Sequence, residues 1–144
     1  MAEKTTGLSA DERAAVKQRA AELRAEEKAG KTREAGEQAV REAIAALPDD
    51  DRVLAEGIDR IVSEVAPHLV RKTWYGFPSY ADANGKIVVF FKPASKFASR
   101  YATLGFEESA KLDDGELWVT SFAVLAITEQ TEPIIADHIR KAAG

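Results

Sequence analysis

The chain contains no cysteine and only two histidines among its 144 residues. Without cysteine there can be no disulfide, no thiolate metal site, no iron–sulfur ligation by this chain and no cysteine nucleophile. Long apolar runs are also missing, since stretches such as Ile87–Phe91 fall far short of the roughly 20 residues that span a membrane. The charged N-terminus lacks an apolar signal core. These absences predict a cytoplasmic protein with no membrane partner.

The balance of charge is also modest. The net charge is −4, with 45% hydrophobic and 31% charged residues. A charge this mild argues against a nucleic-acid partner. The length and composition fit one folded domain with a small appendage, and they leave the oligomeric state open.

Sequence motifs of catalysis are missing as well. The chain has no G-x-S-x-G, no phosphate-binding loop and no dinucleotide fingerprint, and Gly76–Ser79 has the wrong spacing for a nucleophile elbow. We therefore expect a binding or carrier protein without a tightly bound cofactor, rather than a hydrolase, transferase or oxidoreductase.

The first segment has the pattern of a helix with little to bury. Ser9 and Glu12 form a capping box, and the helix is expected to run to about Ala29. Its large apolar residues, Leu8, Val16 and Leu23, make a thin stripe. Residues 1–33 are thus predicted to be a docked or partly mobile helical arm, and residues 34–144 the folded domain.

Three further helices are predicted, one ending at Pro48, a core helix closed by Pro67, and a last helix capped by Thr128 or Thr131. The apolar residues expected on their inner faces are Val40, Ile44 and Leu47; Leu54, Ile58, Ile61, Val62 and Val65; and Ile135, Ile139 and Ala142.

Between the core helix and the last helix the pattern becomes that of strands. Asn84-Gly85 is the signature of a type I′ hairpin turn, whereas Gly76 is expected to bend a strand. The expected strands are Val70–Tyr75, Phe77–Ala81, Ile87–Lys92, Phe97–Phe106 and Leu117–Leu125. The order predicts an α+β fold, an antiparallel β-sheet with helices packed on one face.

Carboxylates of the core helix are the first candidate site. Residues 49–66 hold six acids against two arginines, and exposed carboxylates can bind a hard cation weakly. The alternative is a solvated face that neutralises itself, because Asp49, Arg52, Glu56 and Arg60 lie at salt-bridge spacing. His68 and His138 are expected to be packed or surface residues rather than metal ligands.

The second candidate site is the sheet, where aromatic and basic residues alternate. Such a mixture could bind an anionic small ligand or stack single-stranded nucleic acid. The alternative is a sheet whose inner aromatics are core and whose lysines block edge pairing. The candidate ligand-binding residues are Lys72, Trp74, Tyr75, Phe77, Tyr80, Lys92 and Arg100.

From about Glu37 to Ala143 the chain resembles the YdhG-like family of domains of unknown function. The residues that carry the resemblance are Ala45–Pro48, Ala66-Pro67, Lys72–Tyr80, Asn84–Lys86 and Val88–Phe91. The resemblance implies a frataxin-like α+β sandwich. One branch of the family is regarded as a bacterial frataxin-like iron chaperone, which implies weakly held ferrous iron and iron-cluster assembly proteins as partners. The matching carboxylates are Asp49, Asp50, Asp51, Glu56 and Asp59.

Overall fold

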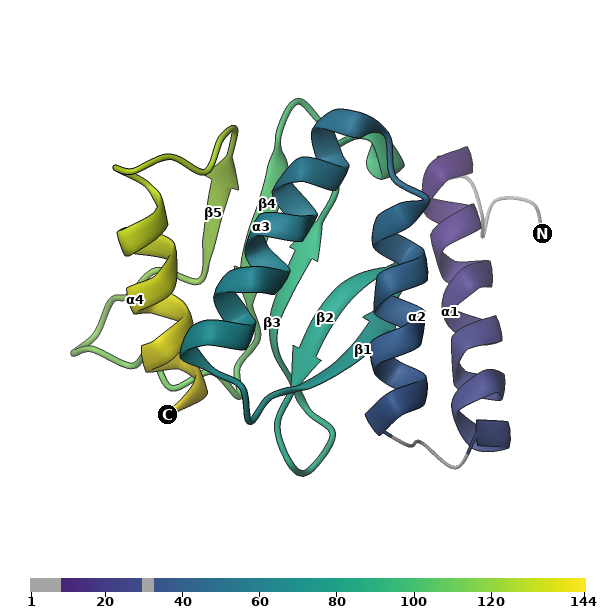
Figure 1. Cartoon of the computed structure of the whole chain (residues 1–144), viewed down its shortest axis with the longest axis horizontal. Coiled ribbons are helices and arrows are strands. Elements are labelled where there is room, and N and C mark those ends of the chain that lie inside the picture. Colours follow the sequence, from purple (N-terminus) through teal and green to yellow (C-terminus); the bar gives the residue numbers. More distant parts are fainter. Residues whose placement is uncertain (1–8, 30–32) are drawn as a thin grey trace.

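The computed structural model describes residues 9–29 and 33–144, which form helices packed on a five-stranded antiparallel sheet (Figure 1). The strands follow the chain order β1-β2-β3-β4-β5 across the sheet. The elements are α1 (Ala10–Ala29), α2 (Arg33–Ala45), α3 (Asp49–Val65), β1 (Val70–Trp74), β2 (Phe77–Ala81), β3 (Ile87–Lys92), the 3₁₀ helix η2 (Ser95–Phe97), β4 (Ala102–Phe106), β5 (Ser121–Val124) and α4 (Glu132–Ala143).

The helices α2, α3 and α4 lie in front of one face of the sheet (Figure 1). The register places alternate residues on opposite faces. Arg71, Tyr80, Val89 and Phe106 are paired neighbours on the face that these helices cover. The predicted fold class, α+β with helices packed on one sheet face, is confirmed.

The core lies between that face and the helices, and the predicted inner faces supply most of it. Val40 of α2, Ile58 and Ile61 of α3 and Ile139 of α4 are almost completely buried, whereas Leu54 is only partly buried. From the sheet, Tyr80 and the side chains of Val89, Phe91 and Leu104 complete this core. The helical periodicity therefore identified the inward residues correctly.

The arm helix α1 docks through polar contacts. Its predicted capping box is confirmed, because the Ser9 N–H donates to the Glu12 carboxylate (2.8 Å) and the Glu12 N–H to the Ser9 hydroxyl (3.0 Å). Val16 and Leu23 are 51% and 48% exposed, so the apolar stripe faces outward. The remaining member of that stripe, Leu8, lies outside the described residues.

Contacts of α1 with the sheet come from the flank of the helix next to that stripe, where Ala15 is buried. The Arg19 guanidinium donates to the Thr73 carbonyl (3.4 Å), and the Glu22 carboxylate accepts the Gly76 N–H (2.7 Å). The helix therefore lies at the end of the β1–β2 hairpin, beside α2 (Figure 1).

The Gly76 bend predicted within a strand is instead a complete hairpin turn. Trp74 pairs with Phe77, which leaves Tyr75 and Gly76 as a two-residue loop with φ of 53° and 86°. Two successive positive φ angles are what a type I′ turn requires. Because only one of the two loop residues is a glycine, there was little indication in the sequence of a type I′ turn here.

The turn at Asn84-Gly85 forms a hairpin, but the predicted type I′ geometry is wrong. Only Gly85 has a positive φ (82°), and its N–H donates to the Asp82 carbonyl (2.9 Å). The Asp82 carboxylate accepts the N–H groups of Asn84 (2.9 Å) and Lys86 (3.0 Å). An aspartate turn at Asp82 therefore lengthens the loop.

The last two strands are shorter than predicted. Residues 95–97 form η2 and β4 begins only at Ala102, so Phe97 and Tyr101 do not lie on a strand. β5 covers only Ser121–Val124, and Trp118 lies in the irregular segment before it. The apolar and aromatic residues at these positions have the sequence pattern of a strand, although they lie in irregular segments.

Candidate functional site

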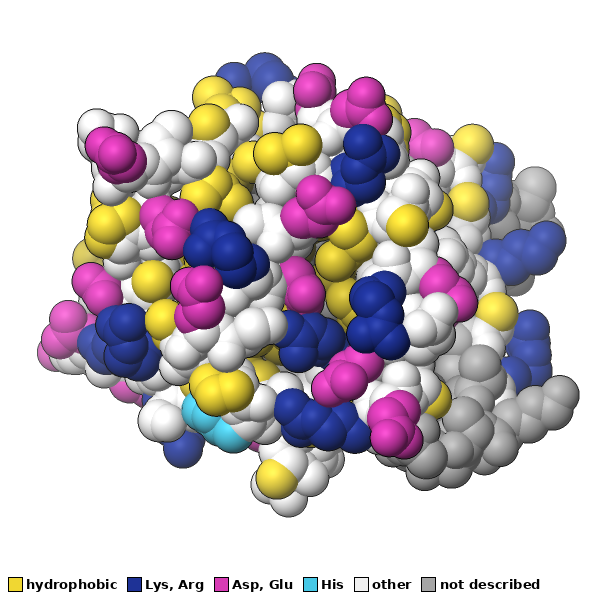
Figure 2. Space-filling model, in the orientation of Figure 1, with side chains coloured by type: hydrophobic (Ala, Val, Ile, Leu, Met, Phe, Trp, Pro, Cys, Tyr) yellow, Lys and Arg dark blue, Asp and Glu magenta, His cyan; other side chains and the backbone are white. Residues whose placement is uncertain are grey.

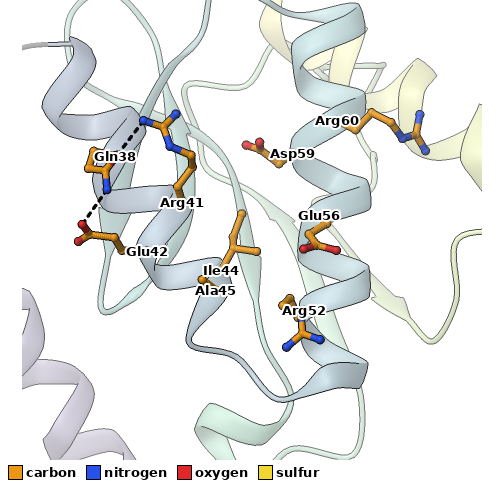
Figure 3. A pocket seen from close by; sticks show the side chains of 9 residues that line it. All are labelled: Gln38, Arg41, Glu42, Ile44, Ala45, Arg52, Glu56, Asp59 and Arg60. Atoms are coloured by element: carbon orange, nitrogen blue, oxygen red, sulfur yellow. Dashed lines mark hydrogen bonds between the residues drawn. The ribbon is translucent and has the colours of Figure 1, made fainter.

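One hollow of the described surface is a groove of about 750 Å³ between α2 and α3. Figure 2 shows charged side chains of both signs around apolar atoms between these helices. A smaller hollow of about 310 Å³ shares Arg41 and Asp59 with it and continues toward Arg71. The residues that line the larger hollow are Gln38, Arg41, Glu42, Ile44, Ala45, Arg52, Glu56, Asp59 and Arg60 (Figure 3).

The position of α2 is fixed by a glycine. A Cβ atom at Gly36 would collide with the carbonyl oxygen of Arg71, so only glycine lets α2 approach β1 this closely. Below the groove, Val40 is fully buried and Ile44 is 6% exposed. The groove is therefore a surface feature above buried apolar side chains.

The inner end of the groove holds a polar network around Asp59. The Arg71 guanidinium donates to the Asp59 carboxylate (2.7 Å) and to the Ser63 hydroxyl, and the Tyr80 hydroxyl donates to the same carboxylate (2.9 Å). Three elements, α3, β1 and β2, thus meet at one carboxylate. These bonds hold Asp59 in one orientation at the floor of the groove.

Burial determines the proton state of this network. Burial and the negative charge of Asp59 raise the pKa of the Tyr80 hydroxyl well above its ordinary value. Burial lowers the pKa of the Arg71 guanidinium, but the hydrogen bond to Asp59 and its charge outweigh that effect and leave it raised. Tyr80 therefore stays protonated and Arg71 stays charged near neutral pH.

Two of the arginines at the groove are already paired. The Arg52 guanidinium donates to the Asp49 carboxylate (2.8 Å), and that of Arg60 donates to Glu132 of α4 (2.8 Å). Figure 3 shows Arg60 directed away from the groove, toward α4. The hydrogen bond from Arg60 lowers the pKa of the Glu132 carboxyl below its ordinary value.

Glu56 is placed differently from what its sequence neighbours suggested. The pairs expected from spacing were Asp49 with Arg52, Arg52 with Glu56, and Glu56 with Arg60. Only the first is among the ion pairs of the described residues, and Glu56 has no hydrogen bond or ion pair with any described side chain. The expected neutralising pair therefore forms at Asp49, whereas Glu56 is exposed without such a partner among the described side chains.

The predicted metal carboxylates lie in three different settings. Asp49 and Asp50 are exposed at the start of α3, while Asp51 is 5% exposed and accepts the N–H groups of Ala94 and Ser95. Glu56 and Asp59 line the groove. Within residues 9–29 and 33–144, no group of three or more His, Cys, Asp or Glu residues is arranged to hold a metal ion.

The predicted ligand-binding residues of the sheet are also separated. Lys72, Trp74, Phe77 and Lys92 lie on the face opposite the helices, with Tyr75 in the adjoining turn. Tyr80 lies on the other face, fully buried against α3. Arg100 is in the bend before β4, with its guanidinium 5.2 Å from the Tyr101 ring centre.

Aromatic rings on that second face pack on one another. The Trp74 ring lies 5.3 to 5.9 Å from the rings of Tyr75, Phe77 and Phe90, edge to face in each case. Phe97 of η2 joins through Phe77 at 5.8 Å. We call these five residues the aromatic cluster; Phe77 is 4% exposed and the other four are half-buried. The rings form a second small core, which leaves little free ring surface for stacking.

Both histidines agree with the expectation of packed or surface residues. The His138 ring lies 4.8 Å from that of Phe122, and its Nδ1 is 2.9 Å from the Ile134 carbonyl oxygen. His68 is exposed, with its Nε2 3.4 Å from the Ala143 carbonyl oxygen.

The sequence did not predict the arginines of α3 or the residues of α2 as parts of a site. Gln38 and Arg41 flank the apolar stripe of Val40 and Ile44, and that flanking position was the signal available. A polar residue beside an apolar stripe is common, however, so the pattern identifies a groove only once the neighbouring helix is placed.

Comparisons of the chain with protein-family models, curated proteins and solved structures give no match. None of the helices that the structure describes is long and apolar enough to cross a membrane. What the site can do chemically therefore follows from its geometry. It offers charges of both signs, a polar network at its floor and the apolar side chains of Ile44 and Ala45, which are features of a binding site.

Proposed function

We propose that this chain is a non-catalytic binding protein that holds a small polar ligand in the groove between α2 and α3. The observation that carries the proposal is a hollow of about 750 Å³, lined by charged side chains and lying above the buried side chains of Val40 and Ile44. Pockets for small ligands in proteins typically measure about 300–1,000 Å³ and combine apolar floors with a few polar groups.

The polar network at the floor supports binding rather than catalysis. Asp59 and Arg71 neutralise each other, and Tyr80 keeps its proton at any pH near neutrality. A general acid or base needs a pKa close to the working pH. This network supplies fixed hydrogen-bonding groups instead, so the ligand is bound and released unchanged.

A fragment screen followed by ¹H–¹⁵N NMR tests this proposal. We expect the amide signals that shift to belong to α2 and α3, with Ala45 and Gly57 as reporters. Shifts confined to Trp74, Phe90 and their neighbours would favour the aromatic and basic sheet as a binding surface for an anionic ligand or single-stranded nucleic acid. Shifts in neither region would overturn both proposals.

A matched pair of variants sharpens the screen. Ala45 lines the groove, whereas its neighbour Ala46 is exposed outside it. Ala45→Trp should fill the groove and abolish binding of the fragments, and Ala46→Trp should leave binding unchanged. Equal effects of the two substitutions would contradict the assignment.

Weak carriage of ferrous iron in the cytoplasm, with iron-cluster assembly proteins as partners, is the second candidate function. Besides the YdhG-like resemblance, it is favoured by the placement of Glu56 and Asp59, three residues apart on α3, in the same groove. Anaerobic calorimetry with Fe²⁺ should show weak binding that Glu56→Gln and Asp50→Asn reduce and that Glu34→Gln does not. Heat of binding unaffected by all three substitutions would remove iron carriage by these carboxylates.

A further inference from the structure

Three charged side chains of the groove lining have no charged partner among the described residues: Arg41 and Glu42 on α2, and Glu56 on α3. On α2, Arg41 donates one hydrogen bond to the Gln38 side chain (2.9 Å), which is neutral. On α3, Glu56 has no partner among the described side chains. The charges of Arg52, Arg60 and Asp59 are each compensated by an ion pair of 2.7 to 2.8 Å.

Glu42 is the remaining acid of the lining, and it does not face the other wall. Its carboxylate accepts the Gln38 amide N–H (2.8 Å), and Figure 3 shows it on the side of α2 that points away from α3. Ile44 lies between the two helices in the same view. An incoming ligand therefore meets one cation on α2, one anion on α3 and an apolar surface between them.

We propose that the ligand of this groove is a linear zwitterion of peptide type, whose carboxylate binds Arg41 and whose ammonium group binds Glu56. The inference rests on the proposed binding function of the same groove and adds the chemical class of its ligand. A guanidinium binds a carboxylate through two parallel hydrogen bonds, and the single bond to Gln38 leaves Arg41 with donors to spare.

The placement of the two charges on separate helices sets the length of the ligand. Axes of helices in direct contact lie about 8–10 Å apart, and here a groove separates α2 from α3. Each residue of an extended chain spans about 3.3–3.6 Å. A free α-amino acid carries both charges on one carbon and is too short to reach both walls. A peptide of two or three residues has its terminal charges far enough apart and can lay its backbone over Ile44 and Ala45.

Trialanine is the probe for the test, with N-acetyl-trialanine and trialanine amide as forms that lack one terminal charge. Binding to the full chain is followed by NMR titration of the groove amides. We expect each blocked peptide to bind about five-fold more weakly than trialanine, the size expected for one partly exposed ion pair. Equal affinity of all three peptides would overturn the inference.

Charge-removing variants identify the two partners. Glu56→Gln should weaken the binding of trialanine about five-fold. It should leave the binding of N-acetyl-trialanine unchanged, because acetylation and the substitution each remove the same ion pair. Arg41→Gln should likewise weaken the binding of trialanine about five-fold and leave the binding of trialanine amide unchanged. Glu34→Gln on α2 and Arg100→Gln near the sheet lie outside the groove and should have no effect. If a substitution weakened the binding of the blocked peptide as much as that of trialanine, the proposed pairing of that terminus with that residue would be wrong.

The two levels of the proposal fail in distinguishable ways. Fragments that bind the groove without any preference for terminal charges would leave the binding function standing and remove the zwitterion. If neither fragments nor peptides shift the α2 and α3 amides, the proposed function and the ligand class both fall.

Discussion

Adjacent residues of β3 enter opposite environments on the two faces of the sheet. Phe91 is fully buried beneath the helices, whereas Phe90 is half-buried in the aromatic cluster, where its ring covers Gly105 of β4. The helix-covered face combines a dense core with a charged groove at its border. The opposite face has aromatic and basic residues, but its rings pack on one another.

This difference between the two faces shows that aromatic and basic composition alone does not define a binding surface. Lys92 contributes to the basic character of the second face, yet its ammonium group lies 4.8 Å from the Phe97 ring centre, in a cation–π contact. Groups already paired with each other have less to offer a ligand. In the groove, by contrast, Arg41 and Glu56 retain charges that no described side chain neutralises.

The sharpest way to test the contrast between the faces is to truncate these neighbouring phenylalanines. Phe91→Ala should destabilise the protein by about 3–5 kcal/mol, because it opens a cavity in a closed core. Phe90→Ala should cost about 1–2 kcal/mol, because that ring is partly hydrated already. Urea unfolding followed by circular dichroism measures both. Equal losses would show that the aromatic cluster is as much a core as the helix-covered face.

Removal of the arm tests the division into a helical arm and a folded domain. A chain beginning at residue 34 should still unfold cooperatively, with a loss of about 2 kcal/mol for the hydrogen bonds that Arg19 and Glu22 make to the hairpin end. Tryptophan fluorescence should change because Trp74 lies next to that end. Loss of the folded state would show that residues 1–33 belong to the domain.

A smaller effect is expected at Tyr80, on the helix-covered face. Tyr80→Phe removes one hydrogen bond to Asp59 and should cost about 1 kcal/mol near neutral pH. Because the pKa of Tyr80 is raised on folding, the native protein should lose stability as the pH rises above about 10, where the unfolded tyrosine ionises. The variant should lose less over that range, and Tyr101→Phe, at an exposed ring, should behave like the native protein.

The smallest effect concerns the ion pair between Arg60 and Glu132, which links α3 to α4. The pKa of Glu132 is lowered on folding by the hydrogen bond from Arg60, so its stabilising effect is present above the unfolded pKa, about 4.3, and is lost as the pH falls through the folded pKa. In the Glu132→Gln variant, the free energy of unfolding should therefore decrease slightly less than in the native protein as the pH falls below about 4.3. Glu129→Gln is the control, and identical curves for native and Glu132→Gln proteins would contradict the prediction.

The sequence was sufficient for the fold class and for the buried helical residues. Periodic apolar positions such as Ile58 and Ile139 identify an inner face without knowledge of any neighbour. Turn geometry was harder, because the positive φ of Tyr75 has no sequence signature and the Asp82 side chain changed the expected turn. The resemblance to the YdhG-like family stays a prediction.

The candidate site was predicted only in part, because its charges are defined by tertiary pairing. Glu56 and Asp59 were among the expected site residues, but Arg41 was not. Arg60 pairs with Glu132, 72 residues away, rather than with Glu56 four residues earlier. Spacing within one helix cannot show which partner a long side chain will choose, so the residual charge of Glu56 could be recognised only in the folded structure.

The buried carboxylate of Asp51 has a consequence for local opening of the fold. It belongs to the first turn of α3 yet accepts the amide hydrogens of Ala94 and Ser95, which lie in the connection after β3. Loop amides ordinarily exchange their hydrogens with solvent quickly. These two can exchange only when their hydrogen bonds to Asp51 break, so they should exchange with deuterium more slowly than unbonded loop amides. The carboxylate of Asp51 thus links the stability of the connection between β3 and β4 to that of the first turn of α3.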